Sequence, residues 1–329
     1  MYSQEITRAH KAAIVIAIDQ SCSMSGRMDV DGWDISKAES VAMVAGRIID
    51  ELILRSKRDN TIRDYYDIAI VGYSDDEVYS LLGGELDFVP IAQLTNREVE
   101  HTTYLLSHLT LNGVSDFYED VSLWVKPRAQ GDTPMYKMIL RVTEMVEAWC
   151  LERAHMDSFP PIVFNITDGE ASDADEEMLR RAAHRLMQSG TNDGNTLFAN
   201  IHISSNTLHP PLIFPTESEL LFTDRYAQLL KDISSVMPKQ FLPHIMECRN
   251  QSYNPFGSAH YAMSDNRAYS DAHHRHPQRP LLLTTAPRHQ RAHPKHPNDD
   301  TPRYRGRRTL GCIDCSRGLP PYTRADSAP

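Results

Sequence analysis

The sequence lacks a long apolar run and has few cysteines. No apolar stretch in the 329 residues approaches the roughly 20 residues that cross a bilayer. The amino-terminal segment MYSQEITRAHK leads into a short apolar run with the wrong flanks for a signal peptide. The cysteines are odd in number and scattered, unlike a disulfide framework, at Cys22, Cys150, Cys248, Cys312 and Cys315. We therefore expect a cytoplasmic protein with reduced thiols and no membrane partner.

The sequence also has no excess of basic residues. The chain has 34 Lys and Arg against 44 Asp and Glu, a formal net charge of -10. A surface of this sign repels the nucleic-acid backbone, so no nucleic acid is expected for the core domain. Neither GxGxxG nor GxxxxGK[ST] occurs, so the sequence has no glycine-rich phosphate loop.

Four apolar segments rich in branched residues predict buried strands. Near-continuous apolar strands are typical of a parallel sheet that is covered on both faces. These segments are Ala12–Ile18, Asp67–Tyr73, Ile162–Thr167 and Thr196–Ser204. A fifth strand is expected over Val78–Leu82 at the edge of the sheet, whereas residues 86–130 are expected to form a small helix and long loops.

Helical patterns alternate with these strands. Apolar side chains recur at three- and four-residue spacing in four stretches, which are Ile35–Leu52, Met135–Trp149, Met178–Leu186 and Tyr226–Ile233. Ser36 and Glu39 have the spacing of a capping box, and Thr133-Pro134 fits an N-cap followed by a first-turn proline. The alternation predicts an α/β fold, a doubly wound, mostly parallel sheet with helices on both faces.

The composition changes near Asn254. From there to Pro329 the chain holds 12 Lys and Arg against 6 Asp and no Glu, while the preceding part holds 22 basic and 38 acidic residues. This segment has almost no periodic apolar pattern, so it cannot offset its ordering entropy by burial. We expect a domain over residues 1–250 and a disordered basic tail over 251–329. The tail is either a natural segment or the product of a shifted reading frame.

Oxygen-bearing side chains stand at the predicted strand ends. Ligand sites of open α/β sheets lie at the carboxyl ends of the strands. The residues at these positions are Asp19, Ser21, Ser23, Thr133 and Asp168. Two carboxylates and three hydroxyls form a hard oxygen set that suits Mg²⁺ or Mn²⁺ rather than zinc or copper. The alternative is a polar turn whose Ser or Asp caps the next helix.

An apolar strand followed by Asp-x-Ser-x-Ser, a distant Thr, and Asp-Gly after another apolar strand resembles a known site. It is similar to the metal-ion-dependent adhesion site (MIDAS) of von Willebrand factor A (VWA) domains, here of the bacterial cytoplasmic type. The resemblance covers about Ala12 to Met237 and implies a Rossmann-like VWA fold. It implies metal ligation, directly or through water, by the two serines and the threonine, with the two aspartates often acting through water.

The resemblance also implies a function. A VWA domain with this site is expected to be a protein-binding module, in which a bound Mg²⁺ takes an acidic group, Asp or Glu, of a partner protein. We expect an intracellular adaptor rather than an enzyme. Two alternatives stay open: a Mg²⁺-dependent hydrolase or phosphotransferase that uses Asp19, and a scaffold whose metal site is vestigial.

Three weaker groups of residues have two interpretations each. Acidic residues around Gly32-Trp33 either recruit Ca²⁺ or form a solvated loop, and these are Asp29, Asp31 and Asp34. The pair Cys312-x-x-Cys315 is half a zinc knuckle or an incidental pair. Residues after the Asp168 loop are expected to line the site or cap the following helix, namely Glu170, Ser172, Asp173 and Asp175.

Overall fold

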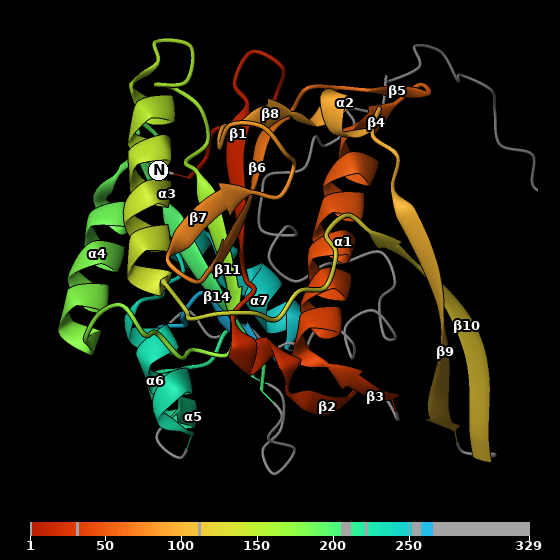
Figure 1. The fold of residues 1–329 in the computed structure, drawn as a ribbon. Coiled ribbons are helices and arrows are strands. Elements are labelled where there is room, and N and C mark those ends of the chain that lie inside the picture. Colours follow the sequence, from red (N-terminus) through yellow and green to blue (C-terminus); the bar gives the residue numbers. More distant parts are fainter. Residues whose placement is uncertain are drawn as a thin grey trace, which may run out of the picture. The chain divides into compact units, whose positions relative to one another are not determined.

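A computed structural model describes residues 2–30, 33–110, 113–204, 212–220, 223–249, 251 and 258–265, all in one compact unit. Within these residues a sheet of seven strands forms the centre of the domain (Figure 1). Its main path has the order β15-β14-β11-β1-β6-β7, and β8 also pairs with β6. The bounds are β1 Ala12–Asp19, β6 Tyr66–Ser74, β7 Glu77–Ser80, β8 Val89–Pro90, β11 Ile162–Thr167, β14 Leu197–His202 and β15 Met263–Asp265.

The core lies on both faces of this sheet, as the apolar strands predict. Alternate residues of a strand point to opposite faces. Ile14 and Ile16 of β1 belong to the core cluster that includes residues of α1 and α7, while Ala13 and Val15 belong to the cluster with α3, α4 and α6. In Figure 1, α1 lies on one side of the sheet and α3 and α4 on the other. The predicted doubly wound α/β class is confirmed, with mainly parallel pairing.

The helices begin close to the predicted residues. Their bounds are α1 Lys37–Ser56, α2 Ile91–Leu94, α3 Met135–Leu151, α4 Glu176–Gln188, α5 Glu217–Leu220, α6 Arg225–Asp232 and α7 Leu242–Cys248. The capping box of α1 is confirmed, because the Ser36 hydroxyl accepts from the Glu39 N–H and the Glu39 carboxylate accepts from the Ser36 N–H. No helix of the described residues is long and apolar enough to cross a membrane.

The edge next to β6 differs in part from prediction. Strand β7 lies at the edge as expected, pairing antiparallel with β6. Residues 86–130 contain the predicted short helix α2, but the expected long loops are wrong. Instead β9 Glu100–Thr110 and β10 Gly113–Leu123 form a long antiparallel ribbon. It lies beside α1 in Figure 1, and a Cβ at Gly46 of α1 would overlap the Ser122 carbonyl of β10.

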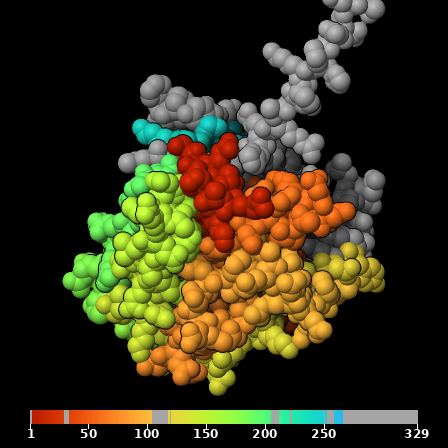
Figure 2. Space-filling view, turned by 90° about the horizontal axis from the view of Figure 1, so that it is seen from above, coloured from red at the N-terminus to blue at the C-terminus, as the bar shows by residue number. Residues whose placement is uncertain are grey.

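Smaller elements connect the layers. They are the turn η1 Cys22–Ser25, η2 Lys239–Phe241, and the hairpins β2 Arg27–Val30 with β3 Trp33–Ser36, β4 Lys57–Arg58 with β5 Thr61–Ile62, and β12 Gly190–Thr191 with β13 Gly194–Asn195. Figure 2 looks from above, and the red amino-terminal residues lie on the surface beside the yellow-green segment that contains α3.

One strand of the sheet lies beyond residue 250, where composition placed the end of the domain. Strand β15 pairs parallel with β14, and its three residues are buried. The preceding residues His260 and Ala262 are buried as well. The sheet domain therefore continues at least to Asp265. A strand of three residues is too short to give a periodic apolar signal, which explains why the sequence pattern missed it. The expected tail from 266 onward lies outside the described residues.

The order of strands sets the place of the site. From β1 the chain crosses by α1 to β6 on one side, whereas β11 lies on the other side of β1 and leads by α4 to β14. A reversal of this kind in strand order opens a crevice at the carboxyl ends of the neighbouring strands. Strand β1 ends at Asp19, and Asp168 directly follows β11. The two predicted carboxylates thus flank the switch point.

Candidate functional site

Asp19 lies at the buried end of β1 and accepts hydrogen bonds on both carboxylate oxygens. The Ser21 N–H donates to Oδ1 at 2.9 Å, and the Thr167 hydroxyl donates to Oδ2 at 2.6 Å. Thr167 is the last residue of β11, and it also accepts from the Gly169 N–H at 3.0 Å. Asp19 therefore ties the loop after β1 to the loop after β11.

The two serines of the Asp-x-Ser-x-Ser segment present their hydroxyls to each other. Ser21 Oγ lies 3.1 Å from Ser23 Oγ. Ser21 is the N-cap of the turn η1, yet its side chain makes no capping hydrogen bond. The alternative interpretation of this segment is a polar turn whose Ser or Asp caps the next helix, and the Ser21 side chain makes no such cap. Its hydroxyl faces a second oxygen instead.

The segment before Thr133 is bound to the serine loop through its backbone. The Gln130 N–H donates to the Gln20 carbonyl at 2.8 Å, and the Cys22 N–H donates to the Gly131 carbonyl at 2.8 Å. Gly131 has a φ of +75°, and a Cβ there would overlap the Asp75 carboxylate, so a side chain would not fit. This contact holds the distant Thr133 segment beside the loop that follows β1.

Thr133 is buried, but it is not the N-cap of α3, so that prediction was wrong. The N-cap is Pro134, which makes no side-chain cap bond, and the helix begins at Met135. The Asp173 carboxylate accepts from the N–H groups of Tyr136 and Lys137 at 3.0 and 2.9 Å. The first turn of α3 is therefore capped by a side chain from the loop after β11. A capping side chain from a distant segment gives no signal in local spacing, which is why the sequence pattern pointed to Thr133.

The loop after β11 completes the arrangement. The Ser172 N–H donates to the Thr133 carbonyl at 3.0 Å, and the Thr133 N–H donates to the Ser172 hydroxyl at 2.9 Å. Asp175 caps α4 by accepting from the Met178 N–H, as expected for this group of residues. Three loops that are far apart in sequence are therefore joined edge to edge by hydrogen bonds, and each carries one part of the predicted oxygen set.

Asp168 is buried and pairs with a lysine that the sequence pattern did not indicate. Lys37 Nζ lies 2.9 Å from Asp168 Oδ2, and the side chains are 17% and 4% exposed. Gly169 follows with a φ of +89°, and a Cβ there would lie 2.7 Å from the Tyr226 Cβ, so glycine is required. Lys37 begins α1, 131 residues before Asp168, and no local spacing connects the two.

Burial dominates the electrostatics of the site. Removal from water raises the pKa of Asp19 from 3.8 to about 6, the hydrogen bonds from Ser21 and Thr167 oppose the shift, and the charge of Asp168 adds to it. Two carboxylates thus lie in a poorly solvated region with one ammonium group between α1 and β11. A divalent cation near Asp19 would favour its charged form and so oppose the effect of burial on its pKa.

The residue types fit a hard cation. Two buried carboxylates and serine and threonine hydroxyls offer only oxygen ligands, the chemistry that Mg²⁺ and Mn²⁺ prefer. Within the described ranges no group of three or more His, Cys, Asp and Glu side chains is placed to hold a metal. The predicted set differs from such a group, since three of its five residues supply hydroxyl groups.

Of the acidic residues around Gly32-Trp33, the structure describes the side chain of Asp34. Asp34 pairs with Arg27 across the β2–β3 hairpin at 3.0 Å, and both side chains are exposed. This is a solvated surface pair, in keeping with the second interpretation of that acidic loop. Asp31, the side chain of Asp29 and the Cys312-x-x-Cys315 pair lie outside the described residues.

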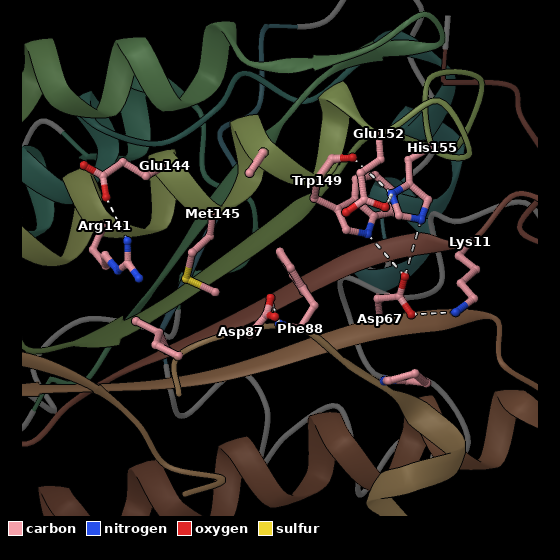
Figure 3. A pocket seen from close by; sticks show the side chains of 13 residues that line it. Lys11, Asp67, Asp87, Phe88, Arg141, Glu144, Met145, Trp149, Glu152 and His155 are labelled. Atoms are coloured by element: carbon pink, nitrogen blue, oxygen red, sulfur yellow. Dashed lines mark hydrogen bonds and ion pairs between the residues drawn. The ribbon is translucent and has the colours of Figure 1, made fainter. Parts of the chain in front are cut away.

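A cavity of about 500 Å³ lies at the other end of the sheet, near the start of β1 (Figure 3). Asp67 accepts there from Lys11 Nζ at 2.8 Å and from Trp149 Nε1 at 3.2 Å. The His155 ring stacks on Trp149 with centroids 4.0 Å apart. Both the lysine and the arginine of the cavity are paired, Lys11 with Asp67 and Arg141 with Glu144, and we assign the cavity no ligand.

No protein-family model and no curated protein matches the sequence. Among solved structures, the chain is similar to a von Willebrand factor type A protein from Catenulispora acidiphila, with 14% identity and a TM-score of 0.36, over 59% of this chain and 34% of that chain. It is also similar to the vWF domain of the type V pili tip protein Mfa5 from Porphyromonas gingivalis, with 17% identity and a TM-score of 0.30, over 49% of this chain and 39% of that chain.

The class that the structure defines is an α/β protein with a mainly parallel, doubly wound sheet and a polar site at its switch point. The matched parts span well under half of either neighbour's length. An uncharacterized membrane spanning protein from Vibrio fischeri is a further neighbour, with 12% identity and a TM-score of 0.22, over 60% of this chain and 93% of that chain.

Proposed function

We propose that the protein is a metal-dependent protein-binding module of the VWA type. In this proposal Mg²⁺ or Mn²⁺ is held by Ser21, Ser23 and Thr133, directly or through water, with Asp19 and Asp168 acting through water. One observation carries the proposal: hydrogen bonds of the backbone and of the Asp19 carboxylate join the three loops that bear these oxygens, at the switch point of the sheet. The metal would supply an electrophilic centre, and a position left open by the protein would accept a carboxylate.

The partner is proposed to present an Asp or Glu side chain. The part of the chain before Asn254 has 38 acidic residues against 22 basic ones, so an acidic partner meets repulsion at long range. A divalent cation at the centre of the contact would replace this repulsion by a local attraction. Binding should therefore depend on the metal both for charge balance and for a direct bond. An intracellular adaptor is the role that we propose for such a module.

The alternative of a Mg²⁺-dependent hydrolase or phosphotransferase is less well supported. A general base or nucleophile needs an oxygen that can reach the substrate. Both oxygens of Asp19 already accept hydrogen bonds, and the residue is only 1% exposed. These contacts suit a residue that fixes two loops and the charge of the site.

One observation favours a different candidate, a scaffold with a vestigial metal site. The Lys37 ammonium group already neutralises Asp168, the task that a metal would perform. In that case surfaces outside the site would bind the partner, and binding would be indifferent to EDTA.

Selection from a random peptide display library by the full chain tests the proposal. With Mg²⁺ present, the selected peptides should share an Asp or Glu, and their binding should disappear in EDTA and in a Ser23→Ala variant. A Ser25→Ala variant, which changes a hydroxyl of the same turn that bonds to the Cys22 carbonyl, should retain binding. Peptides that bind equally in EDTA would overturn the proposal and support the scaffold.

A further inference from the structure

Lys37 is held in place by the start of α1. It follows the Ser36 capping box, and its backbone N–H donates to the Gly26 carbonyl at 2.8 Å. A Cβ at Gly26 would lie 3.5 Å from Lys37 Cε, so the aliphatic stem packs along this glycine. The chain therefore fixes the path of the side chain from both ends, by the helix start and by the ion pair with Asp168.

The ammonium group has a specific electrostatic role. Asp168 Oδ2 accepts from Lys37 Nζ, while Oδ1 faces the Glu170 N–H at a long 3.5 Å. Asp19 is a second buried carboxylate of this site, and the charge of Asp168 contributes to raising its pKa. In the described part of the chain, Lys37 is the cation that pairs with Asp168. A buried carboxylate without its cation is costly, so the pair stabilises the site when no metal is bound.

We propose that Lys37 is a tethered counter-cation that competes with the metal for Asp168. This inference rests on the proposed function, because it concerns the same site. A divalent ion at the oxygen set would lie close to the ammonium group, and like charges at short range in a poorly solvated region repel strongly. Metal entry therefore requires the Lys37 side chain to leave Asp168. The flexible stem and partial exposure of Lys37 permit this movement.

Two consequences follow from this exchange. The metal affinity of the protein is lower than its oxygen set alone would give, because part of the binding free energy is used to break the ion pair. Metal binding also moves the Lys37 ammonium group toward solvent. The site thus has two charge-balanced states, one with lysine and one with metal, and an acidic partner that binds the metal favours the second.

Calorimetry with Mn²⁺ on four full-length chains tests the inference: wild type, Lys37→Met, Lys37→Arg and Lys11→Met. Lys11 is the matched control, because Lys11 Nζ lies 2.8 Å from Asp67 Oδ1 in a similar half-buried pair at the opposite end of the sheet (Figure 3). Lys37→Met should bind Mn²⁺ about tenfold more tightly or better, which corresponds to about 1.4 kcal/mol. Lys37→Arg and Lys11→Met should stay near wild type.

Reductive methylation followed by mass spectrometry supplies a second measurement. Lys37 should be modified faster with Mg²⁺ than without it, while the rate at Lys11 stays the same. Equal Mn²⁺ affinity of wild type and Lys37→Met would overturn the inference and leave the proposed function standing. Binding by Lys37→Met but not by wild type would support the inference and overturn the metal-dependent function. No binding by either chain would overturn both.

Discussion

Tyr73→Phe probes the buried polar network that underlies the site. The Tyr73 hydroxyl donates to Asn165 Oδ1 at 2.8 Å, Asn165 Nδ2 donates to Asn200 Oδ1 at 2.9 Å, and Asn200 Nδ2 donates to Ser234 Oγ at 2.9 Å. These residues are buried and cross β6, β11 and β14. The pKa of the Tyr73 phenol is raised by burial first and by the charge of Asp19 second, so the network ends beside the site.

The expected loss of stability comes from one hydrogen-bond acceptor that is left without its donor. Removing the hydroxyl leaves Asn165 Oδ1 without this donor in a region that excludes water, which costs about 2 kcal/mol. For a domain of this size that lowers the Tm by roughly 4–8 °C. Thermal and urea denaturation should show this change without a change in the slope of the urea transition. Tyr118→Phe is the control, because Tyr118 is 76% exposed.

A double-mutant cycle with Asn165→Ala then isolates the pair, and the coupling should be about 1 kcal/mol. A Tyr73→Phe variant within about 0.5 kcal/mol of wild type, or a coupling near zero, would refute the reasoning.

Three further predictions concern the site loops. Burial raises the pKa of Asp19 from 3.8 to about 6. The stabilising contribution of the protonated carboxyl is therefore fully present below pH 3.8 and is lost as pH rises through 6. Metal-free Asp19→Asn should have a higher Tm than wild type at pH 7.5 and a similar Tm near pH 4. Asp173→Ala and Asp175→Ala should each cost about 1 kcal/mol in denaturation, since each removes a helix cap, but only Asp173→Ala should weaken Mn²⁺ binding. At pH 8, a thiol reagent followed by peptide mass spectrometry should modify exposed Cys22 and spare Cys150, whose thiol pKa burial raises to about 12; rapid modification of Cys150 would contradict its buried placement.

The elements that the sequence predicted well are those with strong periodicity. The strand over Ile162–Thr167 has the predicted bounds, because a strand covered on both faces is apolar at most of its positions. The ribbon β9–β10 was missed, since its residues 100–123 mix polar and apolar side chains without clear alternation. Strand β15 was missed because three residues carry no period.

The candidate site shows the same division. Asp19 and Asp168 could be placed at neighbouring strand ends because parallel strands end at one edge of the sheet. The partners of these residues could not be predicted. Lys37 meets Asp168, and Asp173 caps α3, only after distant loops come together, and neither contact leaves a pattern in local sequence. The local sequence pattern pointed to Thr133 as the N-cap of α3 because it could not show the contact with Asp173.

The central claim is that the oxygen set at the switch point binds one divalent metal ion. Titration of the full chain with Mn²⁺, followed by electron paramagnetic resonance of the free ion, tests it most directly. Wild type should take up one Mn²⁺ per chain in competition with Mg²⁺, and an Asp19→Ala, Ser21→Ala double variant that remains folded should take up none at the same concentration. Uptake that is unchanged in the double variant, or absent from wild type, would contradict the account.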